Sequence, residues 1–297
     1  MRAPQLFDAT AFDVAALTRA KGATTVSVCI PARDEAATVG RIVTAIRSRL
    51  MVGDGLVDEI VVIDDHSTDR TAEVATDAGA RVVASAETLP EFGSGLRKGG
   101  ALWKSVHVAT GDIIAWCDAD IRKFDERFIV GLIGPMLLDP DIAFVKGFYE
   151  RPDDGVGGGR VTELLARPAI SLLLPELASF VQPLSGEYAG RRSLLERVPF
   201  VCGYGVDLGL LVDVVRLVGP DAVAQVDLGT RAHRHRPLDE LGPQAVEVLA
   251  VALRRCNVPV AQPAVLERPG RAPLAVHYAE LPPLADLVPE PESPTPA

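Results

Sequence analysis

The chain has 297 residues, of which 48% are hydrophobic and 24% are charged, which supplies the apolar material for one large domain. Its net charge of −10 disfavours a general nucleic-acid or anionic-membrane surface, because such ligands are met by basic patches. The four cysteines form no metal-binding or disulfide pattern, and neither a signal peptide nor an apolar run of ~18 residues is visible. We therefore expect a cytoplasmic protein without membrane insertion.

The first part of the chain alternates strand-like and helix-like patterns. Apolar, β-rich runs predict strands at Thr25–Ile30, Glu59–Asp65, Arg81–Ser85, Asp112–Cys117 and Ile142–Tyr149. Helical spacing predicts helices over Ala36–Leu50 and Lys98–Ala109, and Ser67 and Thr68 are the predicted caps of another helix. Near-continuous apolar strands separated by helices favour an α/β fold with a parallel sheet covered on both faces.

The second part is less regular. A glycine-rich loop at residues 153–159 precedes predicted helices at Val206–Val218 and Ala245–Arg255 and a predicted strand at Val223–Arg234. The proline-rich end is expected to be disordered over Pro289–Ala297. We divide the chain into residues 1–150, residues 151–256 and a C-terminal extension at 257–297.

Acidic clusters follow three of the predicted strands: Asp34-Glu35, Asp64-Asp65 and Asp118-Ala119-Asp120. Ligands of parallel α/β sheets bind beyond the carboxyl ends of the strands, where these clusters are expected to meet. Asp118 and Asp120 offer the oxygen ligands that a hard divalent cation takes together with phosphate oxygens. For each cluster alone, a turn or helix-capping role is the competing interpretation.

The order of these motifs resembles the nucleotide-sugar domain of GT-A glycosyltransferases. The segments that carry the resemblance are Pro31–Glu35, Asp64–Asp69, Arg97–Gly100 and Asp118–Asp120, followed by Gly159–Pro168, Tyr204–Asp207 and Arg231–Pro237. With the last three segments, the chain resembles the glucosyl-3-phosphoglycerate synthases, a family whose relatives include the actinobacterial mannosyl-3-phosphoglycerate synthases. The resemblance covers most of Thr24–Cys256. It implies a GT-A fold with a nucleotide-sugar-binding part at 1–150 and a mixed α/β part at 151–256 for acceptor binding and dimerisation.

The resemblance also implies an activity, which is the retaining transfer of glucose from UDP-glucose to the 2-hydroxyl of 3-phosphoglycerate. It implies Mg²⁺ or Mn²⁺ as the metal, a homodimer, and an early step toward methylglucose lipopolysaccharides. The implied donor site comprises Pro31, Ala32, Asp34, Glu35, Asp65, Lys98, Asp118, Ala119, Tyr204, Asp207 and Arg231. The implied acceptor site comprises Gly159, Arg160, Val161, Thr162 and His235, and the implied metal ligands are Asp120 and His233. Asp120, Lys98, Asp207 and Arg231 are the implied catalytic residues.

The acceptor segment makes chemical sense by itself, because glycine and a helix start favour an anion and Arg160 adds a charged fork. Ala119, Asp207 and His235 stand where mycobacterial relatives usually carry serine, glutamate and asparagine. The shorter Asp207 leaves glucose from UDP-glucose and mannose from GDP-mannose both open. Two further alternatives are a transferase for a polyprenyl phosphate or polysaccharide and an inactive nucleotide-sugar-binding scaffold.

Overall fold

The computed structural model describes residues 3–94, 96–150, 159–231, 238–261, 264–276 and 278–287. The strands are β1 (Gln5–Asp8), β2 (Val26–Ala32), β3 (Glu59–Asp64), β4 (Arg81–Ala84), β5 (Ile113–Trp116), β6 (Phe144–Glu150), β7 (Tyr188–Arg191), β8 (Phe200–Val201), β9 (Val223–Thr230), β10 (Val265–Leu266), β11 (Leu274–Ala275) and β12 (Glu280–Leu281). The α-helices are α1 (Val14–Lys21), α2 (Val39–Ile46), α3 (Thr71–Asp77), α4 (Arg97–Val108), α5 (Arg127–Leu138), α6 (Arg167–Leu173), α7 (Arg192–Leu195), α8 (Val206–Val218) and α9 (Leu238–Arg255).

The centre of the molecule is a sheet of eight strands in the order β1-β9-β6-β7-β5-β2-β3-β4. Neighbours pair in parallel except at β7, which is antiparallel to both β5 and β6. Strands from residues 1–150 and from residues 151–256 belong to this one sheet. The separate functions of residues 1–150, 151–256 and 257–297 stay a prediction. Because β7 runs backwards, its first residues lie at the same sheet edge as the last residues of β5 and β6.

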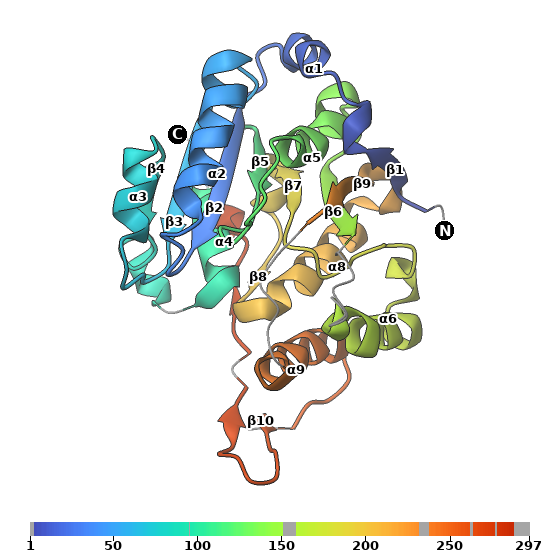
Figure 1. The fold of residues 1–297 in the computed structure, drawn as a ribbon. Coiled ribbons are helices and arrows are strands. Elements are labelled where there is room, and N and C mark those ends of the chain that lie inside the picture. Colours follow the sequence, from blue (N-terminus) through green and yellow to red (C-terminus); the bar gives the residue numbers. More distant parts are fainter. Residues whose placement is uncertain are drawn as a thin grey trace, which may run out of the picture.

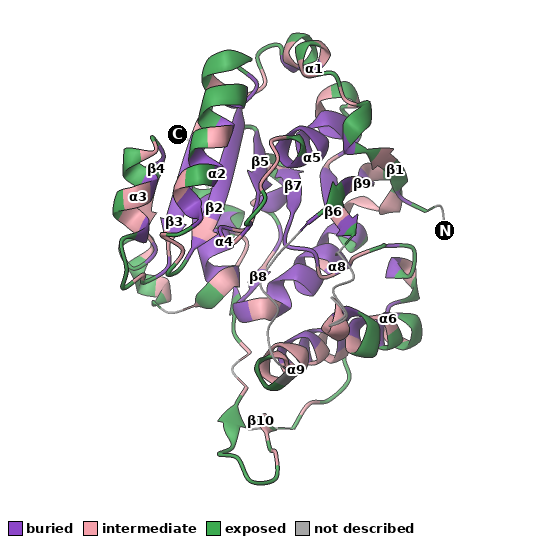
Figure 2. Cartoon of the chain, in the orientation of Figure 1, coloured by how far each residue is buried: buried purple, intermediate pink, exposed green. Residues whose placement is uncertain are grey.

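Helices cover both faces of this sheet (Figure 1). One hydrophobic cluster joins buried residues of α1, α2, α3 and α5 to one face, and another joins α4, α6, α8 and α9 to the opposite face. Figure 2 shows the central strands of the sheet buried, whereas the edge strand β1 is not, and helices such as α2 and α3 expose their outer surfaces. The short β10–β11 hairpin projects from this body beside α9 (Figure 1). The predicted α/β architecture with a mainly parallel sheet is therefore confirmed.

Several predicted elements match closely, and α8 has the predicted bounds. The helix predicted over Ala36–Leu50 begins only at Val39 and passes into a wider π-helical turn at Arg47–Gly53. The predicted caps were wrong, since α3 begins at Thr71 and Arg70 precedes it without a side-chain cap. The part of the predicted strand beyond Arg231 and the C-terminal segment after residue 287 lie outside the described residues.

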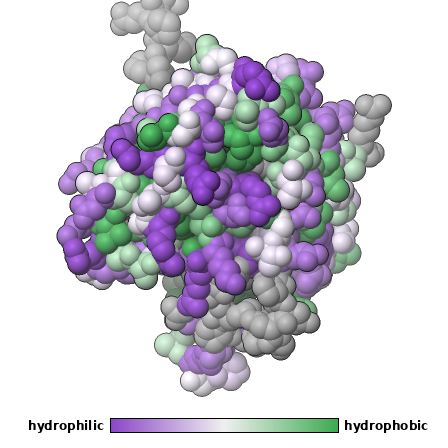
Figure 3. Space-filling view, turned by 45° about the horizontal axis from the view of Figure 1, so that its top comes forward, coloured by the Kyte–Doolittle hydropathy of each residue, from purple (hydrophilic) through white to green (hydrophobic). Residues whose placement is uncertain are grey.

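The cysteines form no disulfides in the structure, and the face of the molecule in Figure 3 is mainly hydrophilic. Cys29, Cys117, Cys202 and Cys256 carry free thiols, and the first three are buried. Figure 3 shows a face on which hydrophilic residues predominate, with smaller hydrophobic areas between them. Among the described residues, none of the helices combines the length and apolar character that crossing a bilayer requires.

Candidate active site

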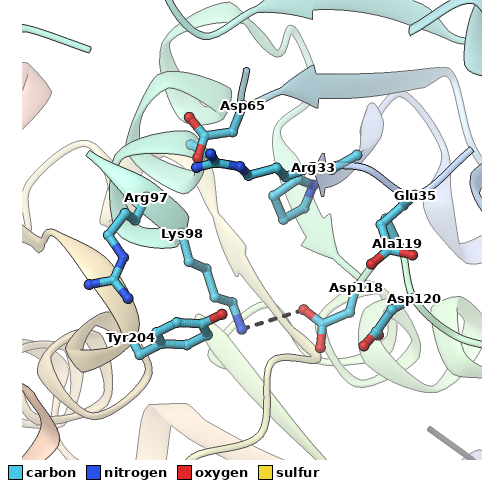
Figure 4. Close-up of a pocket in the computed structure, with 12 residues that line it drawn as sticks. Arg33, Glu35, Asp65, Arg97, Lys98, Asp118, Ala119, Asp120 and Tyr204 are labelled. Carbon is cyan, nitrogen blue, oxygen red and sulfur yellow. Dashed lines mark ion pairs between the residues drawn. The ribbon is translucent and has the colours of Figure 1, made fainter. Parts of the chain in front are cut away.

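A pocket of about 380 Å³ opens at the edge of the sheet where β2, β3 and β5 end. Its lining residues are Pro31, Ala32, Arg33, Glu35, Asp65, Arg97, Lys98, Ala101, Asp118, Ala119, Asp120 and Tyr204. Figure 4 shows Asp118 and Asp120 on one side of this pocket and Arg97 and Tyr204 on the other. The acidic clusters that follow the three strands therefore meet at one cavity, as the parallel topology predicts.

The loops after β2 and β3 are tied together by Asp34. Its backbone N–H donates to Ser67 Oγ at 3.0 Å, and its carboxylate accepts from the N–H of Thr68 at 2.7 Å. These contacts hold the pKa of Asp34 below its usual value, and its positive φ of 55° fits the turn that they close. Asp34 therefore shapes the loop beside the pocket, while Pro31, Ala32 and Glu35 line the pocket itself.

Two other carboxylates line this part of the pocket in different environments. Partial burial raises the pKa of Glu35, whose carboxylate accepts a hydrogen bond from Thr38 Oγ1 at 3.0 Å. Asp65 is buried at the end of β3, and its Oδ1 lies 3.1 Å from Nδ1 of His66. Both positions leave oxygen acceptors at the wall of a cavity of nucleotide size.

Lys98 lies between two carboxylates. Its Nζ is 3.4 Å from Asp118 Oδ1 and 3.3 Å from Asp207 Oδ2, so α4, the end of β5 and α8 meet at this amine. Although burial alone lowers the pKa of Lys98, the charges of Asp118 and Asp207 outweigh it and raise the pKa well above its ordinary value. Lys98 is therefore a fixed positive charge inside the pocket.

Arg231, directly after β9, joins the two aspartates that follow β5. Its Nη2 lies 3.1 Å from Asp118 Oδ2 and 3.0 Å from Asp120 Oδ1, and its Nη1 pairs with Glu187. Burial raises the pKa of Asp118, but Lys98 and Arg231 outweigh it and hold the pKa well below its usual range. Residues more than 100 positions apart thus form one compensated charge cluster.

The sequence interpretation missed Glu187, which is fully buried. It precedes β7, the antiparallel strand, and therefore arrives at the edge where the parallel strands end. Gly186 makes this approach possible, because a Cβ there would lie 2.6 Å from Lys98 Nζ and 2.8 Å from Asp118 Oδ2. Burial raises the pKa of Glu187 despite the adjacent Arg231. Only the pattern Ser185-Gly186-Glu187 before a short strand could have drawn attention to it.

Tyr188 and Lys146, which the sequence interpretation also missed, contact Asp207. Tyr188 donates its phenolic O–H to Asp207 Oδ1 at 3.2 Å, and Lys146 Nζ lies 3.3 Å from the backbone oxygen of Asp207. The same amine lies 4.3 Å from the centroid of the Tyr188 ring. Burial lowers the pKa of Lys146 to about 8. Asp207 is consequently held on both of its carboxylate oxygens, by Tyr188 and Lys98.

The donor set of this pocket fits a hard divalent cation. Asp118 and Asp120 keep 27% and 35% of their side chains exposed, so their oxygens are accessible from the cavity. Mg²⁺ is usually bound by one or two carboxylates together with substrate phosphates. Within the described ranges, no group of three or more His, Cys, Asp or Glu side chains is placed to hold an ion. His233, the other expected ligand, lies outside the described residues.

The expected acceptor residues lie at the start of a helical segment. Arg160 and Val161 open it after Gly159, whose φ is 77°, and Glu163 donates its backbone N–H to Gly159 O at 2.9 Å. Thr162, which follows Val161, is buried. None of residues 159–162 lines the pocket described above. His235 lies outside the described residues. Their role in acceptor binding therefore stays a prediction.

The mainly parallel sheet and the two aspartates that follow β5 have the arrangement of a GT-A-type glycosyltransferase, and the family model for glycosyl transferase family 2 matches residues 27–205. Glucosyl-3-phosphoglycerate synthase of Mycolicibacterium smegmatis is 49% identical over 251 residues, which cover 82% of each chain. This chain belongs to the glucosyl-3-phosphoglycerate synthase family, whose members are metal-dependent hexosyltransferases.

Two solved structures have the same fold as this chain over nearly its whole length. The Mycobacterium tuberculosis enzyme in complex with Mn²⁺, UDP-glucose and phosphoglyceric acid has a TM-score of 0.88 at 42% identity, over 96% of this chain and 99% of that one. Mannosyl-3-phosphoglycerate synthase of Rubrobacter xylanophilus also has a TM-score of 0.88, at 36% identity, over 96% and 97% of the two chains. Fold similarity of this extent leaves the choice of sugar to individual side chains.

Proposed function

We propose that this protein transfers glucose from UDP-glucose to the 2-hydroxyl of 3-phosphoglycerate, with Mg²⁺ or Mn²⁺ as its metal. The single observation that carries the proposal is that Asp118, Asp120 and Lys98 line one nucleotide-sized pocket, with Arg231 paired to the two aspartates. The named substrates come from the relatives, because the similar Mycobacterium tuberculosis enzyme binds UDP-glucose and phosphoglyceric acid. The charges of these four side chains cancel, so a bound divalent cation would supply the net positive charge that a diphosphate leaving group needs.

The donor would bind with its nucleoside beside the loops after β2 and β3 and its diphosphate beside Asp120. Asp120 and His233 would hold the metal, which when bound neutralises charge on the diphosphate. Lys98 adds a positive charge that is fixed before the reaction begins, so no reorganisation is needed as charge develops on the leaving group. Arg231 is buried and held by Glu187, so it keeps its orientation toward Asp118.

Asp207 would contact the transferred sugar, as the family resemblance implies, although it does not line the pocket described above. Tyr188 and Lys98 hold its carboxylate in a fixed orientation. Asp118 and Tyr204 would complete this part of the donor site. We assign no protein nucleophile: in the described part of the pocket the carboxylates nearest to Lys98 are already paired with cations. The acceptor hydroxyl would then attack on the face from which the diphosphate leaves, which preserves the configuration at the anomeric carbon. NMR of the product tests this step, and a β-linked product from the α-linked donor would reject it.

The acceptor would bind at residues 159–162, where a helix start and Arg160 favour a phosphate and a carboxylate. His235 would add a further polar contact. We also propose a homodimer that uses the second part of the chain, which sedimentation would test. A monomer at micromolar concentration would reject it.

A second candidate is the transfer of mannose from GDP-mannose to the same acceptor. The observation that favours it is Asp207, since a carboxylate one methylene shorter than glutamate changes the reach to the sugar hydroxyls, and a mannosyl-3-phosphoglycerate synthase shares this fold. The described residues of the pocket offer no feature that favours a polyprenyl-phosphate acceptor.

One experiment separates these possibilities. Turnover is measured with UDP- and GDP-linked glucose and mannose against 3-phosphoglycerate and other phosphorylated acids, with and without EDTA. The proposal requires that UDP-glucose with 3-phosphoglycerate gives the highest kcat/KM and that EDTA abolishes it. Preference for GDP-mannose would select the second candidate, and absence of metal-dependent turnover with every pair would leave only a binding scaffold.

A further inference from the structure

The wall of the pocket opposite Asp118 and Asp120 is supported by the C-terminal helix α9. Glu247 of this helix is only 9% exposed and uses both carboxylate oxygens toward the pocket. Its Oε1 pairs with the guanidinium of Arg97, and its Oε2 accepts the backbone N–H of Tyr204 at 2.8 Å. Arg97 and Tyr204 both line the pocket. One buried carboxylate therefore fixes two lining residues that are far from it in sequence.

The backbone around Glu247 is adapted to this contact. Gly203 has a φ of 76°, and a Cβ at this position would lie 2.6 Å from Glu247 Oε2. Gly203 also donates its N–H to Leu96 O at 3.1 Å, which ties the start of α4 to the turn before α8. Arg97 itself has a φ of 60°, a left-handed conformation that disfavours side chains other than glycine. Glycine adopts this backbone conformation without that cost, so a change of Arg97 to glycine would remove the side chain alone.

The guanidinium of Arg97 remains accessible from the pocket. Its side chain is 47% exposed, and its Cζ lies 5.3 Å from the centroid of the Tyr204 ring. A guanidinium carries five N–H donors, so the pair with Glu247 leaves donors for a ligand. In Figure 4, Arg97 lies on the side of the pocket away from Asp118 and Asp120. The diphosphate belongs beside those aspartates, so Arg97 is placed for the nucleoside.

We propose that Arg97 contacts the nucleoside of the donor, donating to oxygen acceptors such as the base carbonyls, and that Glu247 positions it. This inference rests on the proposed use of a nucleotide-sugar donor. Arg97 would be a further cation that contacts the donor, and Glu247 would be its positioning residue. Through Glu247, helix α9 would also support the donor site. Neither residue was expected from the strand-end motifs.

The first test is Arg97→Gly, because glycine keeps the left-handed backbone without steric cost and only the side chain is lost. Dissociation constants of UMP, UDP and UDP-glucose are measured by calorimetry. We expect each to rise about tenfold, the effect of losing one hydrogen bond to a charged group. A loss that grows with the number of phosphates would move Arg97 to the diphosphate and overturn the nucleoside contact. Unchanged binding would overturn both parts of the inference.

The second test is Glu247→Gln, which keeps an oxygen acceptor for the Tyr204 N–H and removes the charge that holds Arg97. We expect UDP to bind about three- to tenfold more weakly and the donor KM to rise with kcat unchanged. In the Arg97→Gly background the same substitution should have no further effect, because it acts through Arg97. An additive loss in the double variant would reject the positioning role.

Asp239→Asn is the matched control. Asp239 is a carboxylate of the same helix, and it pairs with Arg271 at 2.5 Å on the exposed surface. Its substitution should leave nucleotide binding unchanged. Binding of UDP to the unsubstituted protein reports on the proposed donor, whereas the difference between variants reports on Arg97 and Glu247. The two ideas can therefore fail separately.

Discussion

The two walls of the pocket differ in how deeply their polar contacts are buried. Beside β5, the half-buried Asp118 and Lys98 and the buried Arg231 and Glu187 form a cluster in which each charge faces an opposite one. Beside β2 and β3, Asp34 holds its loop through hydrogen bonds that are exposed to solvent. Removing one member of a buried ion cluster leaves an uncompensated charge, whereas water replaces an exposed partner. The comparison predicts a steep hierarchy of mutational effects across one pocket.

The largest effect on activity is expected for Asp120→Ala. It removes a proposed metal ligand and a partner of Arg231, so turnover should fall about a thousandfold, in the range of losing a central electrostatic contact. The fold should persist, because Arg231 keeps Asp118 and Glu187 and the Asp120 side chain is 35% exposed. Turnover and thermal unfolding are measured together. Retained activity with EDTA sensitivity would remove Asp120 from the metal site.

The largest effect on stability is expected for Glu187→Gln. It leaves the guanidinium of Arg231, which is 3% exposed, with less compensating charge, so the free energy of unfolding should fall by about 3–5 kcal/mol. Urea denaturation measures the change. Glu73→Gln is the matched control, because its pair with Arg70 is exposed and its loss should be undetectable. Equal stability of the two variants would contradict the contrast between buried and exposed pairs.

A smaller, pH-dependent effect is expected for Lys146→Met, which keeps the volume and removes the buried amine. The pKa of Lys146 is lowered to about 8, so between pH 8 and the ordinary pKa of lysine the unfolded chain binds the extra proton. The stability of the unsubstituted protein should therefore rise with pH relative to the variant, by at most about 1.4 kcal/mol per unit. Below pH 8 the difference should be constant. Parallel stability profiles from pH 7 to 10 would contradict the lowered pKa.

The smallest effect is expected for Asp34→Ala. Its hydrogen bonds to Thr68 are exposed, so the loop should loosen without unfolding, and the KM for UDP-glucose should rise about threefold, the factor for a weak hydrogen bond. The kcat should stay unchanged because Asp34 does not line the pocket. Asp77→Ala, an exposed change in α3, serves as the control. A hundredfold loss of kcat would place Asp34 in direct contact with the donor.

Local patterns in the sequence determined the main secondary-structure elements of this protein and the positions of their ends. Apolar runs located β2, β3 and β5, and the carboxylates that follow them fall at one edge because parallel strands end together. The residues Lys98, Asp118, Asp207 and Arg231 were assigned to one site through a family resemblance, and the structure brings them together. Periodicity is a local property of the chain, so it predicts elements and their ends.

The tertiary structure alone decided which charges are buried and what they face. The short strand β7 carries no periodic pattern long enough to recognise, yet its antiparallel insertion delivers Glu187 and Tyr188 to the site. Lys146 appears in the sequence as an ordinary strand residue, and Glu247 as one acid of an amphipathic helix. Their partners lie 61 and 150 residues away, at Asp207 and Arg97. Such pairs depend on strand order and helix packing, which no local window of sequence contains.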